Sequence, residues 1–464
     1  MVILKNSLPP ALSYKNVNPF LTALLLVFSS FLLMTWPLPE TIAFRHFNLG
    51  AGFLTSLPLL FYFKKIFLQK SSWTIWIFFG FIFWLLIHLL VFSNEFSSQF
   101  YELKHVWMRS ILAIPIGLAL GITLVDRTSQ PMERKNVVIF LMLCGFSGTC
   151  MIGFSHYIYG VTLSHQLLNY EILFVFYKAK PPFVISAALS LPLAFILIIK
   201  GINQKISRWW IPPSLLIIFL CLFTSYFSNT KNGMVIFCIT FSLFVINLIY
   251  RVNWDSRKYV LGFIILGIIA SLSYQGIEHH IARNDAWRTM LADFQVGVDI
   301  YHQDYWKDRS TYAQPLNQHG MPVDISTYER TAWFTAGAQL LSENPLGYGL
   351  LHHSFGSLAV TKWPDFHKPI GNLRGATHSG WLDFALGLGI PGLLLVLIPL
   401  FISWYRSLFQ EGLWFSYAAW TIPVISFAYL TTEVAGGHFT ELLFFMTAFF
   451  CGLTLISFSK KTSK

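Results

Sequence analysis

Charge is what this sequence lacks most. Of its 464 residues, 11% are charged and 55% are hydrophobic. Soluble domains carry charge on about a quarter of their residues, so the composition excludes an ordinary soluble fold and favours a membrane protein. The net charge of +11 would suit nucleic-acid binding, but the excess of basic residues falls in short loops on one side of the predicted membrane.

Cysteine and nucleotide-binding motifs are also scarce. The five cysteines all lie in apolar segments, and no Cys-x-x-Cys spacing occurs. This argues against a disulfide framework and a zinc site. The chain has neither a Walker motif nor a Rossmann fingerprint, which argues against chemistry driven by ATP or a sugar nucleotide. We therefore expect no metal and no cofactor.

Long apolar runs are what the sequence has instead. A helix needs about 20 mostly apolar residues to cross a membrane. The fold class predicted is all-α: a polytopic membrane protein with about twelve transmembrane helices and one large extracytoplasmic loop containing short helices. We expect spans one to nine within residues 1–275, the loop at 276–377, and the last three spans within 378–464. The predicted spans are roughly 18–36, 48–68, 72–93, 107–125, 136–156, 182–199, 209–228, 232–250, 258–275, 378–404, 413–430 and 439–458.

Lysine and arginine predict the orientation of these spans. Every second short loop is basic, for example at Lys64, Lys65 and Lys70. Basic loops stay on the cytoplasmic side, so both termini are expected there. The first apolar run has no clear cleavage site and is interpreted as a retained span. The loop 276–377 then faces the periplasm, and the chain resides in a bacterial inner membrane.

The long loop contains helical patterns and many aromatic residues. Helices are predicted at 286–298 and 330–342, the second ending at Glu343-Asn344-Pro345. Two interpretations of the aromatic residues stay open: packing of a loop domain, or stacking against sugar rings. These residues are Trp287, Tyr301, Tyr305, Trp306, Tyr312, Tyr328, Trp333 and Trp363.

Three segments carry a resemblance to a known family. They are Ser228 to Gly233; Glu329 to Trp333 with Glu343 to Gly349; and Ala376 to Gly380 with Gly387 to Gly392. In order and spacing they resemble the O-antigen ligase/polymerase superfamily, and most closely O-antigen ligase. That resemblance implies an enzyme, a membrane glycosyltransferase whose donor is a glycan on undecaprenyl diphosphate.

The resemblance also implies site residues. Arg330 matches the family's loop arginine and His378 its essential histidine, and both are predicted to be catalytic. Arg283 resembles an earlier loop arginine. Lys231 stands where relatives usually have arginine, which keeps the charge but not the planar fork. Lys231, Arg283 and Arg109 are predicted to bind the diphosphate, and Arg109 is noted because charge at a span end is expensive and often functional.

The predicted chemistry is an inverting displacement without metal. A neutral His378, with Thr377 expected to cap the following helix, would take the proton of the acceptor hydroxyl. Basic residues would stabilise the leaving diphosphate. Glu433 and His438 are secondary candidates for contacting the acceptor or orienting His378. The pair His352-His353 is a weaker candidate.

Several functions remain open at this stage. The preferred prediction is a ligase that transfers the glycan to lipid A–core lipopolysaccharide. A polysaccharide polymerase and a protein O-oligosaccharyltransferase share the same site and differ in acceptor. A transporter would require charged residues deep within several spans and broken helices near the midplane. A cell-wall polymerase of the rod-shape type would rely on a loop carboxylate rather than on His378.

Overall fold

The computed structural model describes residues 18–38, 41–126, 132–164, 180–251, 256–283, 286–366, 375–432 and 437–455. Over these ranges the regular structure is helical. A helix matches each predicted span, and within the described residues nine helices are long and apolar enough to cross a membrane. This confirms the predicted all-α, multi-pass class. The matching helices are α1 (Pro19–Thr35), α2 (Ile42–Tyr62), α3 (Trp73–Ile87), α5 (Met108–Asp126), α6 (Met132–Ser164), α8 (Pro181–Ile202), α9 (Ile211–Phe227), α10 (Lys231–Arg251), α11 (Ser256–Arg283), α15 (Gly380–Leu408), α16 (Leu413–Thr431) and α17 (Gly437–Leu455).

Some helix ends differ from the predicted ones. The second span was expected to begin at residue 48, but α2 begins at Ile42 and ends at Tyr62, before a 3-10 turn at Lys64–Leu68. The helices α6 and α11 run past the apolar part of their sequences, because backbone hydrogen bonding continues into polar residues. The expected boundary between residues 275 and 276 therefore falls within α11.

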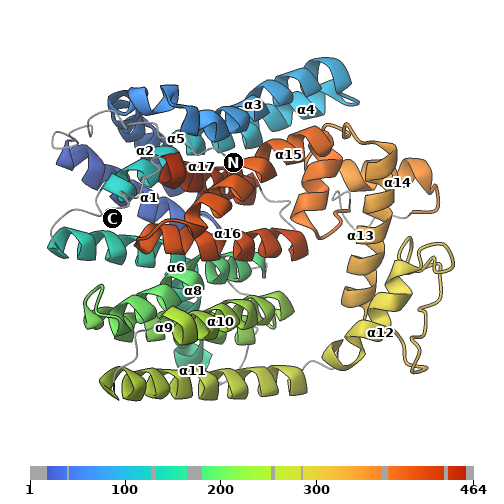
Figure 1. Ribbon diagram of the computed structural model, residues 1–464. Helices are drawn as coiled ribbons and strands as arrows, with labels where there is room; N and C mark the ends of the chain where they lie inside the picture. Colours follow the sequence, from blue (N-terminus) through green and yellow to red (C-terminus); the bar gives the residue numbers. More distant parts are fainter. Residues whose placement is uncertain are drawn as a thin grey trace, which may run out of the picture.

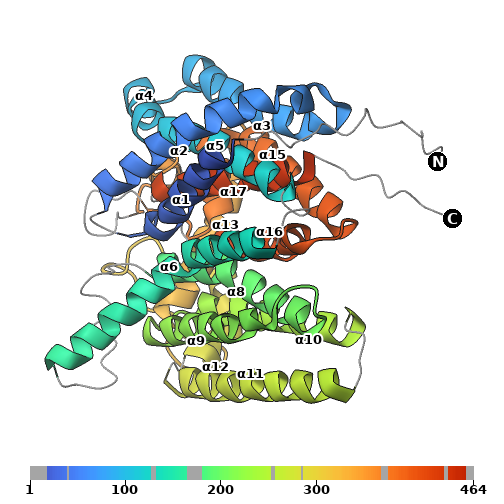
Figure 2. The same ribbon diagram turned by 90° about the vertical axis from the view of Figure 1, so that its left-hand side faces the viewer.

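The long loop packs on one end of the helix bundle. Figure 1 shows the bundle helices running side by side, with α12 (Ala286–Val298), α13 (Ile325–Glu343) and α14 (Ser354–Lys362) gathered beyond one end of them. The helix α12 has the predicted bounds, whereas α13 begins five residues earlier than predicted. Figure 2 shows α9, α10 and α11 as a group on the side of the bundle away from α3 and α4 (Phe96–Glu102). We call the end that carries α12 to α14 the loop end.

Glycine allows α5 and α17 to pack unusually closely. A Cβ on Gly117 would lie 2.1 Å from the carbonyl oxygen of Phe445, and one on Gly121 would lie 2.2 Å from that of Phe449. Small residues four apart permit such backbone contact between membrane helices. The residue numbers of the contacts rise together, from Gly117 with Phe445 to Gly121 with Phe449. The two helices are therefore parallel, and both begin at the loop end.

The helix α15 is broken at Gly389, and a loop turn fills the break. Gly389 has φ 75° and ψ 175°, which is outside the helical region. Pro391 has no N–H, so the Gly387 carbonyl lacks its usual helical partner. The turn Pro345–Gly349 replaces the missing bonds. Its hydrogen bonds run from Tyr348 N to Leu386 O (2.8 Å), from Gly349 N to Gly387 O (2.7 Å), and from Ile390 N to Pro345 O (2.8 Å).

Side chains from an earlier part of the sequence, the segment from α3 to α4, hold this turn and the residues next to it. The carboxylate of Glu102, at the end of α4, accepts the backbone N–H of Leu351 at 2.8 Å. The Tyr348 hydroxyl donates to Glu95 at 2.8 Å. Trp84 of α3 donates its indole N–H to the Leu388 carbonyl at 2.7 Å, within the break. The turn is therefore fixed between α15 and the segment from α3 to α4.

The loop has a hydrophobic core of its own that continues into α15. Trp306, Tyr328 and Trp333 are buried in it, together with Leu382 and Leu386 of α15. Of the two interpretations left open for the aromatic residues, this favours packing for these three and for Tyr305, which belongs to the same core. Tyr301, by contrast, is exposed.

Replacing Gly389 by alanine is expected to destabilise the protein. The new Cβ would lie 2.4 Å from the Leu346 carbonyl atoms, and this backbone conformation, which is almost confined to glycine, alone costs another residue about 1–3 kcal/mol. Thermal unfolding of the purified protein in detergent measures this effect. Gly267→Ala is the matched control, because nothing lies within 4 Å of a Cβ there. An equal melting temperature for both variants would contradict the role of the break.

Candidate functional site

The helix α13 carries the residues that bring the predicted site together. Asp324 is its N-cap, and the Asp324 carboxylate accepts the Thr327 N–H at 2.9 Å. Lys231, the first residue of α10, places its Nζ 3.4 Å from Asp324 Oδ1 and 3.3 Å from Thr327 Oγ1. Lys231 is therefore held against the positive end of the α13 dipole, where it adds to a potential that attracts anions.

Asp324 is kept ionised in this arrangement. Burial alone would raise the pKa of its carboxyl group, but the hydrogen bonds from Thr327 and the charge of Lys231 outweigh burial and lower that pKa below its ordinary value. The carboxylate stays charged at neutral pH and shares the Lys231 ammonium. An incoming phosphate would compete with Asp324 for this cation.

His378 precedes α15 in the sequence and lies beside a later turn of α13. Its imidazole stacks on the indole of Trp333, with ring centroids 5.3 Å apart and planes 11° apart. Thr327 and Trp333 are six residues apart, which is about 9 Å along the axis of α13. Arg330 lies between them in sequence and is exposed. The helix thus lines up Lys231, Arg330 and His378 in that order.

The backbone at His378 is strained. Its φ is 58°, in the left-handed region that non-glycine residues rarely occupy, although histidine tolerates it better than most. Such strain persists only where the surroundings impose it and is concentrated at functional sites. His378 is half-buried, between the buried residues Thr377 and Ser379.

Asp383 fixes the segment that carries His378. Its Oδ1 accepts both the Thr377 N–H at 2.8 Å and the Thr377 hydroxyl at 2.7 Å. The expectation that Thr377 caps the span was wrong, because α15 begins at Gly380 with Ser379 as N-cap residue. The Thr377 hydroxyl instead accepts the Ser379 N–H at 3.2 Å and donates its own hydrogen bond to Asp383.

Three helix ends meet beside this segment. Asn232, next to Lys231, donates its side-chain N–H to the Thr431 carbonyl at 2.5 Å. The Thr432 carbonyl accepts the N–H of Gly380 at 3.1 Å. The beginnings of α10 and α15 are therefore both tied to the end of α16, which brings the first and third sequence segments together.

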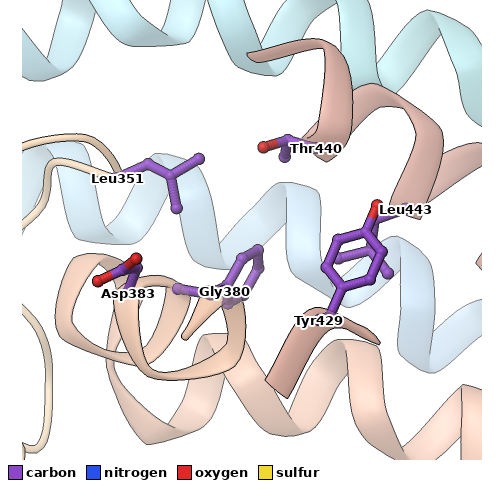
Figure 3. Close-up of a pocket in the computed structure, with 7 residues that line it drawn as sticks. Leu351, Gly380, Asp383, Tyr429, Thr440 and Leu443 are labelled. Carbon is purple, nitrogen blue, oxygen red and sulfur yellow. The ribbon is translucent and has the colours of Figure 1, made fainter. Parts of the chain in front are cut away.

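A small pocket lies next to the first turn of α15. Its volume is about 10 Å3, close to the space that one water molecule needs. Figure 3 shows Asp383 of α15 and Thr440 of α17 at its edges. Its size excludes a sugar. The labelled lining residues are Leu351, Gly380, Asp383, Tyr429, Thr440 and Leu443.

The other predicted residues lie elsewhere. Arg109 belongs to a separate cluster, with its Nε 2.9 Å from the buried carboxylate of Glu441. His438 is half-buried at the beginning of α17, near enough to Arg45 and Arg109 to feel their charges. Arg283 ends α11, but its side chain lies outside the described part of the structure, as does Glu433 altogether.

The sequence itself supports the resemblance given by these segments. Residues 216–397 match the family model described as O-antigen ligase. This part of the chain is therefore similar to the O-antigen ligase/polymerase superfamily. The matched range contains Lys231, Arg330 and His378, whereas Arg109 and Glu441 lie outside it. No curated protein matches the chain.

The family match supports a glycosyltransferase-like activity in general, with a lipid-linked glycan and a glycan acceptor as partners. Two site residues were missed in the sequence. Asp383 and Glu441 are carboxylates within apolar spans, and a charge in that position is costly and usually functional. This signal was available, but it was applied to Arg109 alone. Trp333 was noted only as an aromatic residue of the loop.

Removing the Asp383 carboxylate is expected to loosen the His378 segment. Asp383→Ala leaves the buried Thr377 N–H without its acceptor, which costs about 2 kcal/mol, and so lowers the melting temperature. Asp383→Asn keeps an oxygen at the acceptor position and should lose less. Thermal unfolding of both variants in detergent measures the difference. Equal losses would mean that the carboxylate charge, rather than its hydrogen bonds to Thr377, holds the segment.

Proposed function

We propose that the protein is an O-antigen ligase-type glycosyltransferase. It would move a glycan from undecaprenyl diphosphate to lipid A–core lipopolysaccharide, at the periplasmic face of the inner membrane with both termini in the cytoplasm. The observation that carries the proposal is the placing of Lys231, Arg330 and His378 along α13. The match of residues 216–397 to the O-antigen ligase family model supports it.

His378 is proposed as the general base. The acceptor hydroxyl attacks the anomeric carbon of the donor sugar, and its proton passes to the imidazole. The bond between the anomeric carbon and the diphosphate oxygen breaks, and the electron pair leaves with the diphosphate. Stacking on Trp333 and the hydrogen bonds from Thr377 to Asp383 hold the ring in place. Direct attack from the opposite face inverts the anomeric configuration.

Lys231 and Arg330 are proposed to hold the leaving group. Negative charge on the diphosphate grows as the glycosidic bond breaks, so cations already in place stabilise the transition state more than the ground state. Lys231 lies at the N-terminal end of α13, where the helix dipole acts in the same direction. Arg283 is assigned to the same group by its position in the sequence. The mechanism uses neither a metal nor a cofactor.

His378→Ala is expected to reduce glycan transfer by about 100-fold or more, since general-base catalysis contributes that much. Transfer is measured with purified protein, extracted lipid-linked glycan and lipid A–core. His302→Ala is the matched control, because the His302 side chain is 80% exposed and paired with Asp299 in the same loop. Unchanged transfer by a folded His378→Ala would remove the proposed base.

Lys231 is expected to act through its positive charge and the length of its side chain. Lys231→Ala should lower transfer strongly, whereas Lys231→Arg should retain most of it, because an arginine can still serve both Asp324 and a phosphate. Lipopolysaccharide from a strain that lacks the gene and is complemented with each variant is separated on a gel. Its band pattern identifies the acceptor. A ligase defect leaves core bands alone while lipid-linked polymer accumulates. A single repeat on the core would indicate a polymerase, and loss of a glycoprotein band would indicate a protein acceptor.

A further inference from the structure

A second basic cluster lies at the loop end, where α2, α5 and α17 begin. The Glu441 carboxylate is fully buried, and its two oxygens have different partners. Oε1 lies 2.9 Å from Arg109 Nε, and Oε2 accepts the Trp36 indole N–H at 2.8 Å. Arg45 also lies close enough to Glu441 for their charges to interact. Among the described residues, two guanidinium groups share this one carboxylate.

Arg45 is incompletely satisfied in this cluster. Only 7% of the Arg45 residue is exposed. One Nη donates to the Trp36 carbonyl at 2.9 Å, but Nε has no hydrogen-bond partner in the part of the chain that the structure describes. A buried guanidinium group with an unused donor is expensive. An anion would satisfy both the donor and the excess charge.

Part of the cluster is exposed beside apolar side chains. Arg109 Nη1 lies 3.4 Å from Nε2 of the exposed His46, and 26% of the Arg109 side chain is exposed. The neighbouring residues Ile42, Phe44, Phe47 and Met108 are large, apolar and exposed. A polar opening bordered by exposed apolar side chains at the end of membrane helices suits a lipid, whose headgroup is charged and whose tails are apolar.

The cluster is separate from the Lys231–His378 site, although α17 contributes to both surroundings. Thr440 and Leu443 face the pocket beside Asp383. His438 and Glu441, three residues apart, share another face of the helix, and His438 feels the charges of Arg45 and Arg109. Close packing of α5 on α17 at Gly117 fixes the height of Arg109 relative to Glu441.

We propose that Arg45 and Arg109 form a second anion site, which binds the phosphate headgroup of a membrane lipid. Glu441 and Trp36 orient the two arginines, and His46 and His438 border the opening. The lipid is either a bulk anionic phospholipid or one of the phosphorylated substrate lipids, since both present the same chemistry. The inference does not depend on the proposed transfer reaction, because it concerns binding without turnover.

The test measures lipid binding by the full-length protein in phosphatidylcholine nanodiscs. Phosphatidylglycerol, undecaprenyl phosphate and lipid A are added separately, and bound lipid is counted by native mass spectrometry. Arg109→Gln is expected to weaken binding of the preferred lipid by about tenfold or more, as loss of a charge-assisted bidentate contact does. Glu441→Gln removes the competing charge while keeping an acceptor for Trp36, so it should strengthen binding.

Lys104→Gln is the matched control, because it removes a nearby exposed basic residue whose ammonium group lies over the Phe100 ring. It should leave binding unchanged.

Arg109-dependent binding of phosphatidylglycerol alone would identify a structural phospholipid, and preference for either of the other lipids would identify a substrate site. If Arg109→Gln binds all three lipids as the wild type does, the proposal is overturned and the cluster is a structural ion network. If Arg109→Gln does not fold, the opposite effect of Glu441→Gln decides: no gain in binding overturns the proposal as well.

Discussion

The hydrogen bonds that the break in α15 leaves unsatisfied are the constraint on which the rest of this structure depends. In a membrane protein, free backbone groups must find partners within the protein, because lipid offers none. Gly389 and Pro391 interrupt the helix, and the turn Pro345–Gly349 supplies the missing partners. This contact seats the long loop on the bundle. It therefore sets where α13 lies, and through α13 it places Trp333 against His378.

The two ends of the candidate site are stabilised by different means. At the Lys231 end, charge dominates, since an ammonium group, a carboxylate and a helix end lie within hydrogen-bonding distance. At the His378 end, geometry dominates, because ring stacking and a strained φ fix the imidazole. A group-transfer reaction needs both kinds of control: charge where the leaving group departs, and position where a proton is taken.

Sequence reasoning was successful where the physical signal is local. Apolar runs located the spans, and helical spacing predicted α12 with its observed bounds. It was weaker where partners are distant. Both glycine-rich segments were noted, but their pairing was not, because hydrogen bonds between residues 345–349 and 386–390 leave no periodic trace in either segment. The role of Thr377 was misassigned for a similar reason: its partner Asp383 lies one turn inside the span, where a cap was not sought.

The seating of the loop uses main-chain atoms, and this has an evolutionary consequence. The hydrogen bonds between the turn and the broken helix constrain the glycines, whose Cβ positions are blocked by backbone, and the proline that leaves a carbonyl free. They place no such demand on the loop residues that face outward, such as Tyr301. Mutation can therefore alter the exposed surface of the loop while the attachment to the bundle stays unchanged.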